Sequence, residues 1–302
     1  MVILHEISHM WFGNLVTMKW WDDLWLNESF ANFVSYLSLD EGEGTKQYAG
    51  AWSMFLDESF WGLTTDQKNT THPISVEVIH TEAAFDMFDG ISYGKGAAWL
   101  NQILNLFGRD IFKAGVASYF AEFAFKNTRL EDFILHFNNA AIKHNSPIDF
   151  AKWSHTWLKC AGPNIIWHDV IEEGGKITKF TVQQRVHEEG AGNQLRVQKY
   201  KCAFYDKDMK VARVIDIVTK DDQETFEIPE LVGQDAPFAY HINYQNKGYA
   251  KFKIDEKSTK AFETHLGKIE DPLSRKQIYL IYNDMLKDQA ISGAQVLDIC
   301  KS

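Results

Sequence analysis

The stretch His5-Glu-Ile-Ser-His9, together with Trp25-Leu-Asn-Glu28, decides how this chain is interpreted. Residues four apart on a helix rise about 6 Å and turn about 400°, so both imidazoles project from one face. Two imidazoles on one face suit two corners of a zinc tetrahedron, and Glu6 lies one step round the helix, beside the metal. The spacing predicts a zinc site with His5 and His9 as ligands.

A carboxylate on the next predicted helix favours this interpretation over a surface helix with two solvated histidines. Eighteen residues separate His9 from Glu28, enough for a turn that folds the second helix back antiparallel to the first. Glu28 opens that helix as the third ligand, and a fourth position stays open for water, as catalysis requires. Asp22 and Asp23, in the connecting turn, are alternative carboxylate ligands.

The longer run HEISHMWFGNLVTMKWWDDLWLNESFA, from His5 to Ala31, resembles the signature block of the aminopeptidase N family of gluzincin metalloaminopeptidases. The likeness continues through Thr71–Ile74, Phe88–Ala97 and Trp153–Gly162. The resemblance implies a thermolysin-like catalytic domain that ends near residue 163, followed by a β-sandwich and a helical domain.

The resemblance also implies a role for each matching position. His5, His9 and Glu28 hold one Zn²⁺ per chain, and Glu28 also faces the ammonium group of the substrate. Glu6 takes a proton from the attacking water and later delivers it to the leaving amine. Tyr93 matches the tyrosine of the family's Tyr-x-Lys-Gly element, and its phenol bonds the oxyanion of the tetrahedral intermediate.

One family element does not occur in the sequence. The Gly-x-Met-Glu-Asn motif, which lies upstream of the zinc-binding helix in the family, is not found, and four residues precede His5. We therefore expect an internal segment of a larger enzyme, without the N-terminal domain and with a truncated C-terminal domain. On its own, such a segment is expected to be poorly stable and nearly inactive while it keeps some affinity for zinc.

The hydrophobic period divides the chain into three parts. Up to residue 163 apolar residues recur at helical spacing, as at Phe30, Phe33 and Leu37. From there to residue 255 apolar residues alternate, as in Ile177–Gln184 and Val211–Val218, and about six to eight short strands are predicted. The helical period then returns.

The predicted fold class is multidomain α+β. The helical half of a thermolysin-like catalytic domain is expected over residues 1–163, a β-sandwich over 164–255 and the beginning of a helical domain over 256–302.

Composition excludes some classes of partner. A net charge of −10, spread along the chain, does not provide the basic surface that nucleic acid requires. No apolar run reaches the length of a membrane span. Three scattered cysteines, Cys160, Cys202 and Cys300, suggest no disulfide framework, so a reducing, cytoplasmic compartment is favoured. The expected partners are peptides with a free N-terminus, and the sequence predicts no particular oligomeric state.

Two other interpretations stay open. A leukotriene-hydrolase-like enzyme with both epoxide hydrolase and aminopeptidase activity has a similar site, although the predicted β-sandwich counts against it. A non-catalytic zinc-binding fragment or scaffold is a different class of protein. The intact set of ligands, base and Tyr93 argues against decay of the parent protein.

Overall fold

The computed structural model describes residues 1–45, 48, 50–187 and 194–301. Contacts divide the chain into two units, of which the first comprises Met1–Pro163 and Glu188–Arg196 and the second comprises Asn164–His187 and Val197–Ser302. In the described part of the chain, no helix is both long enough and apolar enough to cross a membrane. Mixed helix and sheet agrees with the α+β class predicted from the sequence.

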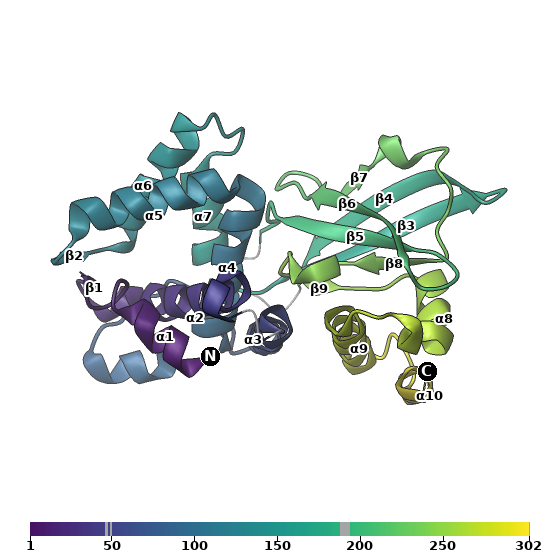
Figure 1. Cartoon of the computed structure of the whole chain (residues 1–302), viewed down its shortest axis with the longest axis horizontal. Helices are drawn as coiled ribbons and strands as arrows, with labels where there is room; N and C mark the ends of the chain where they lie inside the picture. The colour runs from purple at the N-terminus through teal and green to yellow at the C-terminus, as the bar shows by residue number, and fades with distance from the viewer. Residues whose placement is uncertain (46–47, 49, 188–193, 302) are drawn as a thin grey trace. The chain divides into compact units, whose positions relative to one another are not determined.

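The first unit is mostly helical, as the period predicts (Figure 1). Its α-helices are α1 (Val2–His9), α2 (Leu24–Glu41), α3 (Ala51–Asp66), α4 (Gly96–Gln102), α5 (Arg109–Phe123), α6 (Leu130–Lys143) and α7 (Phe150–Lys159). Short 3₁₀ segments are η1 (Trp21–Asp23), η2 (Glu43–Thr45) and η3 (Thr81–Met87), and π-helical turns are η4 (Ile91–Lys95) and η5 (Ile103–Phe107).

Two short strands in this unit were not predicted. β1 (Val16–Met18) pairs in parallel with β2 (Lys126–Thr128). Three residues are too few to establish a period of two, and the partner strand lies more than a hundred residues away in the sequence. The expectation of helical structure up to residue 163 was therefore wrong at this ladder.

The core of the first unit is aromatic. Phe12, which follows α1, stacks on Phe30 of α2 with ring centroids 4.3 Å apart, and this contact fixes α1 against α2. Trp99 of α4 stacks on Trp153 of α7 at 5.9 Å. Each such ring contributes on the order of 2 kcal/mol through burial alone. Trp99 also meets Trp25 of α2 at 5.7 Å, so this aromatic core reaches the helix that carries Glu28.

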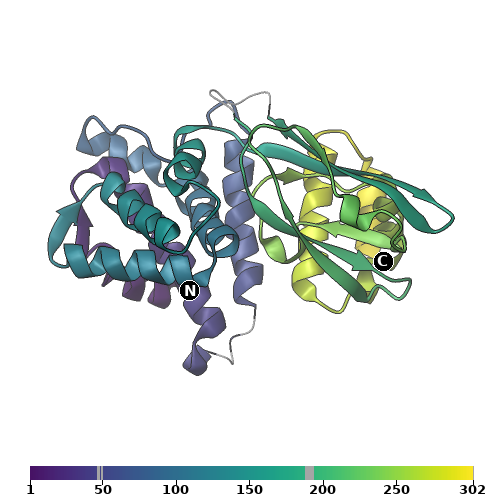
Figure 2. The same ribbon diagram turned by 90° about the horizontal axis from the view of Figure 1, so that it is seen from above.

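The second unit contains two sheets. Its strands are β3 (Asn164–Glu173), β4 (Lys176–Val186), β5 (Lys199–Tyr205), β6 (Val211–Val218), β7 (Thr225–Glu227), β8 (Ala239–Ile242) and β9 (Lys251–Phe252). The sheet orders are β7-β4-β3-β9 and β6-β5-β8, and the long antiparallel β3–β4 hairpin is visible in Figures 1 and 2. The sheets meet through the rings of Phe180 and Phe204, whose centroids are 6.4 Å apart.

Among its described residues the second unit also has the helices α8 (Glu256–His265), α9 (Pro272–Lys287) and α10 (Gly293–Lys301). Asp255 caps α8 through the amide of Ser258, and Asp271 caps α9 through the amides of Leu273 and Ser274. Pro272 lies in the first turn of α9, where a backbone N–H would have no partner within the helix, so proline costs no helical hydrogen bond there. Helix α9 therefore begins at Pro272, directly after its cap Asp271.

Candidate metal centre and its family

Helix α1 carries the two histidines of the predicted motif on one face. The imidazole rings of His5 and His9 lie edge to face, with centroids 4.6 Å apart. Their Nε2 atoms are 3.0 Å from each other, so both rings point at a common position. The i and i+4 spacing on the helix produces this convergence.

Helix α2 brings the carboxylate of Glu28 to the same position. Its Oε2 lies 3.3 Å from His5 Nε2 and 3.6 Å from His9 Nε2. Glu28 falls in the second turn of α2, because the helix begins at Leu24, directly after the 3₁₀ turn η1. The expectation that Glu28 opens the helix was wrong by one turn, while the antiparallel return still delivers its side chain.

The three side chains fit a zinc ion by their chemistry and their mutual distances. One ligand atom from each of His5, His9 and Glu28 lies within 4.8 Å of the other two, and no other such group was found among the described residues. A tetrahedral site with bonds of about 2.0–2.1 Å has ligand atoms roughly 3.3 Å apart, close to the separations seen here. Two imidazoles and one carboxylate are also the ligand set of many catalytic zinc sites.

A backbone carbonyl orients one of the two rings. His9 Nδ1 lies 3.0 Å from the carbonyl oxygen of Phe12, which accepts the Nδ1 proton. The other nitrogen, Nε2, is then left with a lone pair for a metal ion. The sequence could not identify this acceptor, because it belongs to the backbone.

The charge states of the cluster follow from these contacts. Burial acts to raise the pKa of the Glu28 carboxyl, but hydrogen bonds from His5 and His9 outweigh it and lower that pKa to about 2. The hydrogen bond to Glu28 raises the pKa of His9 by more than burial lowers it. The protein alone thus holds an ionised carboxylate against the two imidazoles.

Tyr93 lies beside the cluster on the π-helical turn η4. Its ring stacks on that of His5 with centroids 6.4 Å apart, and its phenol is within hydrogen-bonding reach of Glu28. Burial, together with the negative charge of Glu28, raises the pKa of Tyr93 above its ordinary value. The phenol therefore stays a proton donor at neutral pH. Single π-helical turns often occur at functional sites.

Comparison with known proteins assigns the family. The model of the peptidase family M1 domain matches residues 1–157, more than half of the chain. This chain belongs to peptidase family M1. The resemblance to aminopeptidase N that the sequence suggested is thereby confirmed.

Relatives from several lineages match the M1 chain. Aminopeptidase N of Streptomyces lividans is 34% identical over 308 aligned positions, which cover 99% of this chain and 35% of the relative. Probable aminopeptidase 1 of Saccharolobus solfataricus is 46% identical over 140 positions, covering 46% of this chain and 18% of the relative. Aminopeptidase Ey of Gallus gallus is 41% identical over 150 positions, which cover 49% of this chain and 15% of the relative. The chain spans about a third or less of the length of these relatives.

Glu6, the predicted base of the M1 site, is exposed on α1 between the two histidines. Its negative charge raises the pKa of His9 and the pKa of Tyr93. In both cases this charge contributes less to the shift than Glu28 does.

The alternative ligands Asp22 and Asp23 have other partners in the M1 chain. Asp22 Oδ1 accepts a hydrogen bond of 2.5 Å from the amide of Val78, and Asp23 Oδ2 accepts one of 3.0 Å from the amide of Leu130. Burial raises the pKa of Asp23 to about 6. Neither carboxylate belongs to the three-residue cluster among the described residues, so the alternative in which they bind the metal has no geometric support.

An imidazole and a carboxylate hold the turn that carries Tyr93. Asp89 Oδ1 accepts hydrogen bonds of 3.0 Å from the amides of Ile91 and Ser92, at the start of η4. Its Oδ2 lies 3.0 Å from His72 Nε2, while His72 Nδ1 lies 2.7 Å from the carbonyl oxygen of Pro73. The stretches Thr71–Ile74 and Phe88–Ala97 were singled out in the sequence, but the contact between them could not be read there.

A buried ion pair lies at the end of the same turn. Lys95 Nζ is 2.8 Å from Asp66 Oδ2, and both side chains are fully buried. Burial lowers the pKa of Lys95 to about 8, against the attraction of Asp66. Asp66 Oδ1 also accepts hydrogen bonds from Thr71 Oγ1 and the amide of Gly162. These contacts give Lys95 a structural role at the end of the turn.

Close approach of backbones explains a glycine in η4. A Cβ atom on Gly94 would lie 2.2 Å from the carbonyl oxygen of Glu58 on α3. Any side chain there would push η4 away from α3 and move Tyr93 from its contact with Glu28.

Proposed function

We propose that this chain carries the catalytic site of a zinc aminopeptidase, which hydrolyses the N-terminal peptide bond of peptides. The observation that supports this proposal most directly is the convergence of His5, His9 and Glu28 from two packed helices, inside the segment matched by the M1 family. The names of the relatives, which are aminopeptidases, support the same reaction class.

His5, His9 and Glu28 would hold the metal ion. Zinc, when bound there, supplies a Lewis acid that lowers the pKa of water and polarises the carbonyl to be cleaved. The exposed carboxylate of Glu6, next to His5 in the sequence, would take the proton of the attacking water and deliver it to the leaving amine.

Tyr93 would stabilise the oxygen that gains negative charge during the reaction. Its phenol remains protonated at neutral pH and can donate a hydrogen bond as that charge develops. Glu28 would also face the ammonium group of the substrate, because its carboxylate keeps its negative charge down to low pH.

The finer division of the fold belongs to the same proposal. Residues 1–163 would form the helical half of a thermolysin-like catalytic domain, 164–255 a β-sandwich domain and 256–302 the beginning of a helical domain. The change of period near residue 163 and the two sheets formed by β3 to β9 support this division.

Zinc content and hydrolysis, measured on matched variants, test the proposed roles. We expect one zinc per wild-type chain and only slow release of p-nitroaniline from alanine or leucine p-nitroanilide, because the chain on its own is expected to be nearly inactive. Glu6→Gln should keep the zinc and lower the rate by about 100-fold, because only the proton carrier is removed. His5→Ala should lose both the zinc and the hydrolytic activity. Equal rates for wild type and Glu6→Gln would contradict the role of Glu6, and zinc binding without hydrolysis by the wild-type chain would favour a scaffold.

A further inference from the structure

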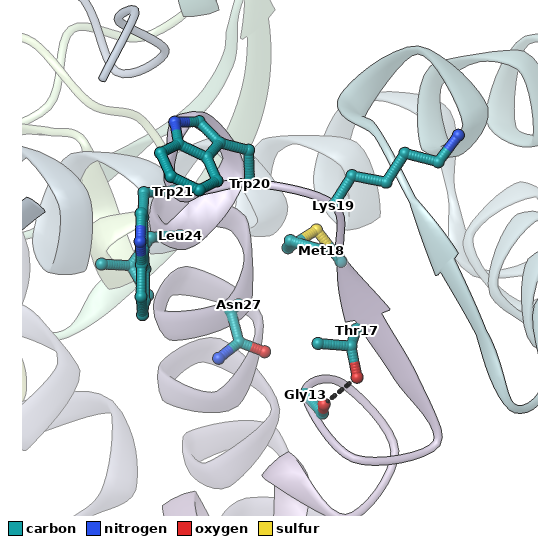
Figure 3. A pocket seen from close by; sticks show the side chains of 8 residues that line it. All are labelled: Gly13, Thr17, Met18, Lys19, Trp20, Trp21, Leu24 and Asn27. Carbon is teal, nitrogen blue, oxygen red and sulfur yellow. Dashed lines mark hydrogen bonds between the residues drawn. The ribbon is translucent and has the colours of Figure 1, made fainter. Parts of the chain in front are cut away.

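A pocket of about 320 Å³ lies between α2 and the segment that follows α1 (Figure 3). Its lining includes none of the metal-ligand candidates, so it is a site separate from the cluster. Most of its wall is apolar, and the complete lining is Gly13, Thr17, Met18, Lys19, Trp20, Trp21, Leu24 and Asn27.

One ring of the aromatic wall, that of Trp20, is held in place by the fold. Trp20 Nε1 donates a hydrogen bond of 2.6 Å to the carbonyl oxygen of Val78. Trp20 and Trp21 nevertheless remain 48% and 38% exposed, so they offer apolar area to a ligand. The side chain of Lys19 extends away from the other lining residues in Figure 3, which leaves the space between α2 and β1 without a charge from it. A preformed, uncharged, aromatic wall suits an uncharged ring.

Asn27 adds one polar group to this apolar pocket. Its Oδ1 is buried and accepts no hydrogen bond from any described residue. Gly13 leaves space for the amide, since a Cβ atom at that position would lie 2.9 Å from Oδ1. Rotation about χ2 can turn either end of the amide toward the pocket, as acceptor or donor. A ligand that bonds this amide removes the cost of an unpaired buried polar group.

We propose that this pocket binds an aromatic side chain of a peptide together with the adjoining peptide group. The ring contacts Trp20 and Trp21, and the peptide group pairs with the side-chain amide of Asn27, which can exchange both a donor and an acceptor with it. The inference rests on the proposed function, in which peptides are the substrates, and it adds a second contact for them outside the metal cluster.

Two blocked amino acids test the pocket on the 302-residue chain. N-acetyl-L-phenylalaninamide has the ring and the peptide groups, while N-acetyl-L-alaninamide lacks the ring, and neither has a free N-terminus for an aminopeptidase to cleave. Titrations followed by the indole N–H signals of Trp20 and Trp21 should give a Kd of about 1 mM for the phenylalanine probe. The alanine probe should bind at least about 10-fold more weakly, and equal binding of the two would overturn the proposal.

Substitutions in the lining locate the binding. Met18→Trp should fill the pocket and abolish binding of the phenylalanine probe, whereas Ile142→Trp, at a 67% exposed position on α6, should leave it unchanged. Asn27→Leu keeps the volume but removes the amide, and it should weaken binding about 5- to 10-fold. Retained binding in a folded Met18→Trp variant, with folding checked by circular dichroism, would contradict the assignment.

A metal-ligand variant separates this inference from the proposed function. His5→Ala should lose zinc and still bind the phenylalanine probe with unchanged affinity. Loss of probe binding in that variant would overturn the separate pocket. If the wild-type chain binds the probe but neither zinc nor hydrolysis is found, the peptidase proposal fails while the pocket stands as a site for aromatic amides.

Discussion

The histidines of the two units differ in what surrounds them. In the first unit, the His5 and His9 side chains are 17% exposed and both contact the carboxylate of Glu28. In the second unit, His168 and His241 are buried, and each has a tyrosine hydroxyl as its hydrogen-bond partner, Tyr200 at 2.8 Å and Tyr205 at 3.4 Å.

The difference explains opposite pKa shifts for the same side chain. Contact with Glu28 raises the pKa of His9, while burial lowers the pKa of His168 to about 3 and that of His241 to about 4. A carboxylate stabilises a positive charge, whether it is a proton or a metal ion, and a buried tyrosine does not compensate the lost hydration of that charge. Two imidazoles that converge with a carboxylate therefore suit a metal site, and burial of an imidazole with a phenol suits a structural contact.

The largest effect is expected where a buried charge in the first unit loses its partner. Lys95→Met would leave the Asp66 carboxylate uncompensated in a fully buried position, and it should lower the free energy of unfolding by about 3–5 kcal/mol. Urea unfolding followed by circular dichroism measures this change. The double variant Lys95→Met, Asp66→Asn should recover part of the loss, and a single variant as stable as wild type would mean that the pair contributes nothing.

A metal titration tests whether the two kinds of histidine differ in function. His9→Ala should weaken zinc binding by about 100-fold, equivalent to about 2.7 kcal/mol, because one of three protein ligands is removed. His168→Gln is the matched control in the second unit and should leave the zinc affinity unchanged. Competition with a chromophoric chelator gives the zinc dissociation constants of both variants. Similar weakening of zinc binding in the two variants would contradict a difference in function between the two kinds of histidine.

The pH dependence of stability tests the buried histidine. The folded-state pKa of His168, about 3, lies below the unfolded value of about 6.5, so between these values the unfolded chain binds a proton that the folded chain does not. Stability from this residue is complete above pH 6.5 and is lost as the pH falls through that window, by up to about 1.4 kcal/mol per pH unit.

The measurement is urea unfolding at pH 6.5 and pH 4.5, with a chelator present in both. The difference between the two pH values should be about 2 kcal/mol smaller in His168→Gln than in wild type, because the variant has no imidazole to protonate at this position. Identical pH differences would show that His168 takes up its proton in the folded state as well.

The smallest effect concerns the turn that carries Tyr93. Asp89→Ala removes the acceptor of the Ile91 and Ser92 amides, and it should cost about 1 kcal/mol and speed hydrogen exchange at Ser92. Asp149→Ala removes the cap of α7 at Lys152 and is the matched control. It should destabilise the chain by a similar amount and leave exchange at Ser92 unchanged, so equal acceleration by both variants would contradict a local role for Asp89.

Much of the helical half could be predicted from local patterns. Phe30, Phe33 and Leu37 follow the helical period, and the observed helix α2 contains all three. The β1–β2 ladder could not be predicted, because its strands are three residues long and pair across a large sequence separation. Interactions of this kind depend on how the helices between them pack, which the local period does not describe.

The sequence by itself determined the residues of the candidate metal site. His5, His9 and Glu28 were identified because the helical repeat brings i and i+4 to one face and because a turn of eighteen residues can reverse the chain. Their assignment as zinc ligands and the roles of Glu6 and Tyr93 remain predictions that the experiments above test. The family assignment likewise followed from the signature run and is now confirmed.

Only the tertiary structure decided the contacts that hold this site. The carbonyl of Phe12 orients His9, Asp89 caps the turn of Tyr93, and the pairing of Asp66 with Lys95 joins α3 to that turn. A backbone carbonyl has no signature in the sequence, and an ion pair between residues 29 positions apart forms only when two helices pack. Helical periodicity is a property of neighbours in the chain, whereas these contacts depend on which surfaces the aromatic core brings together.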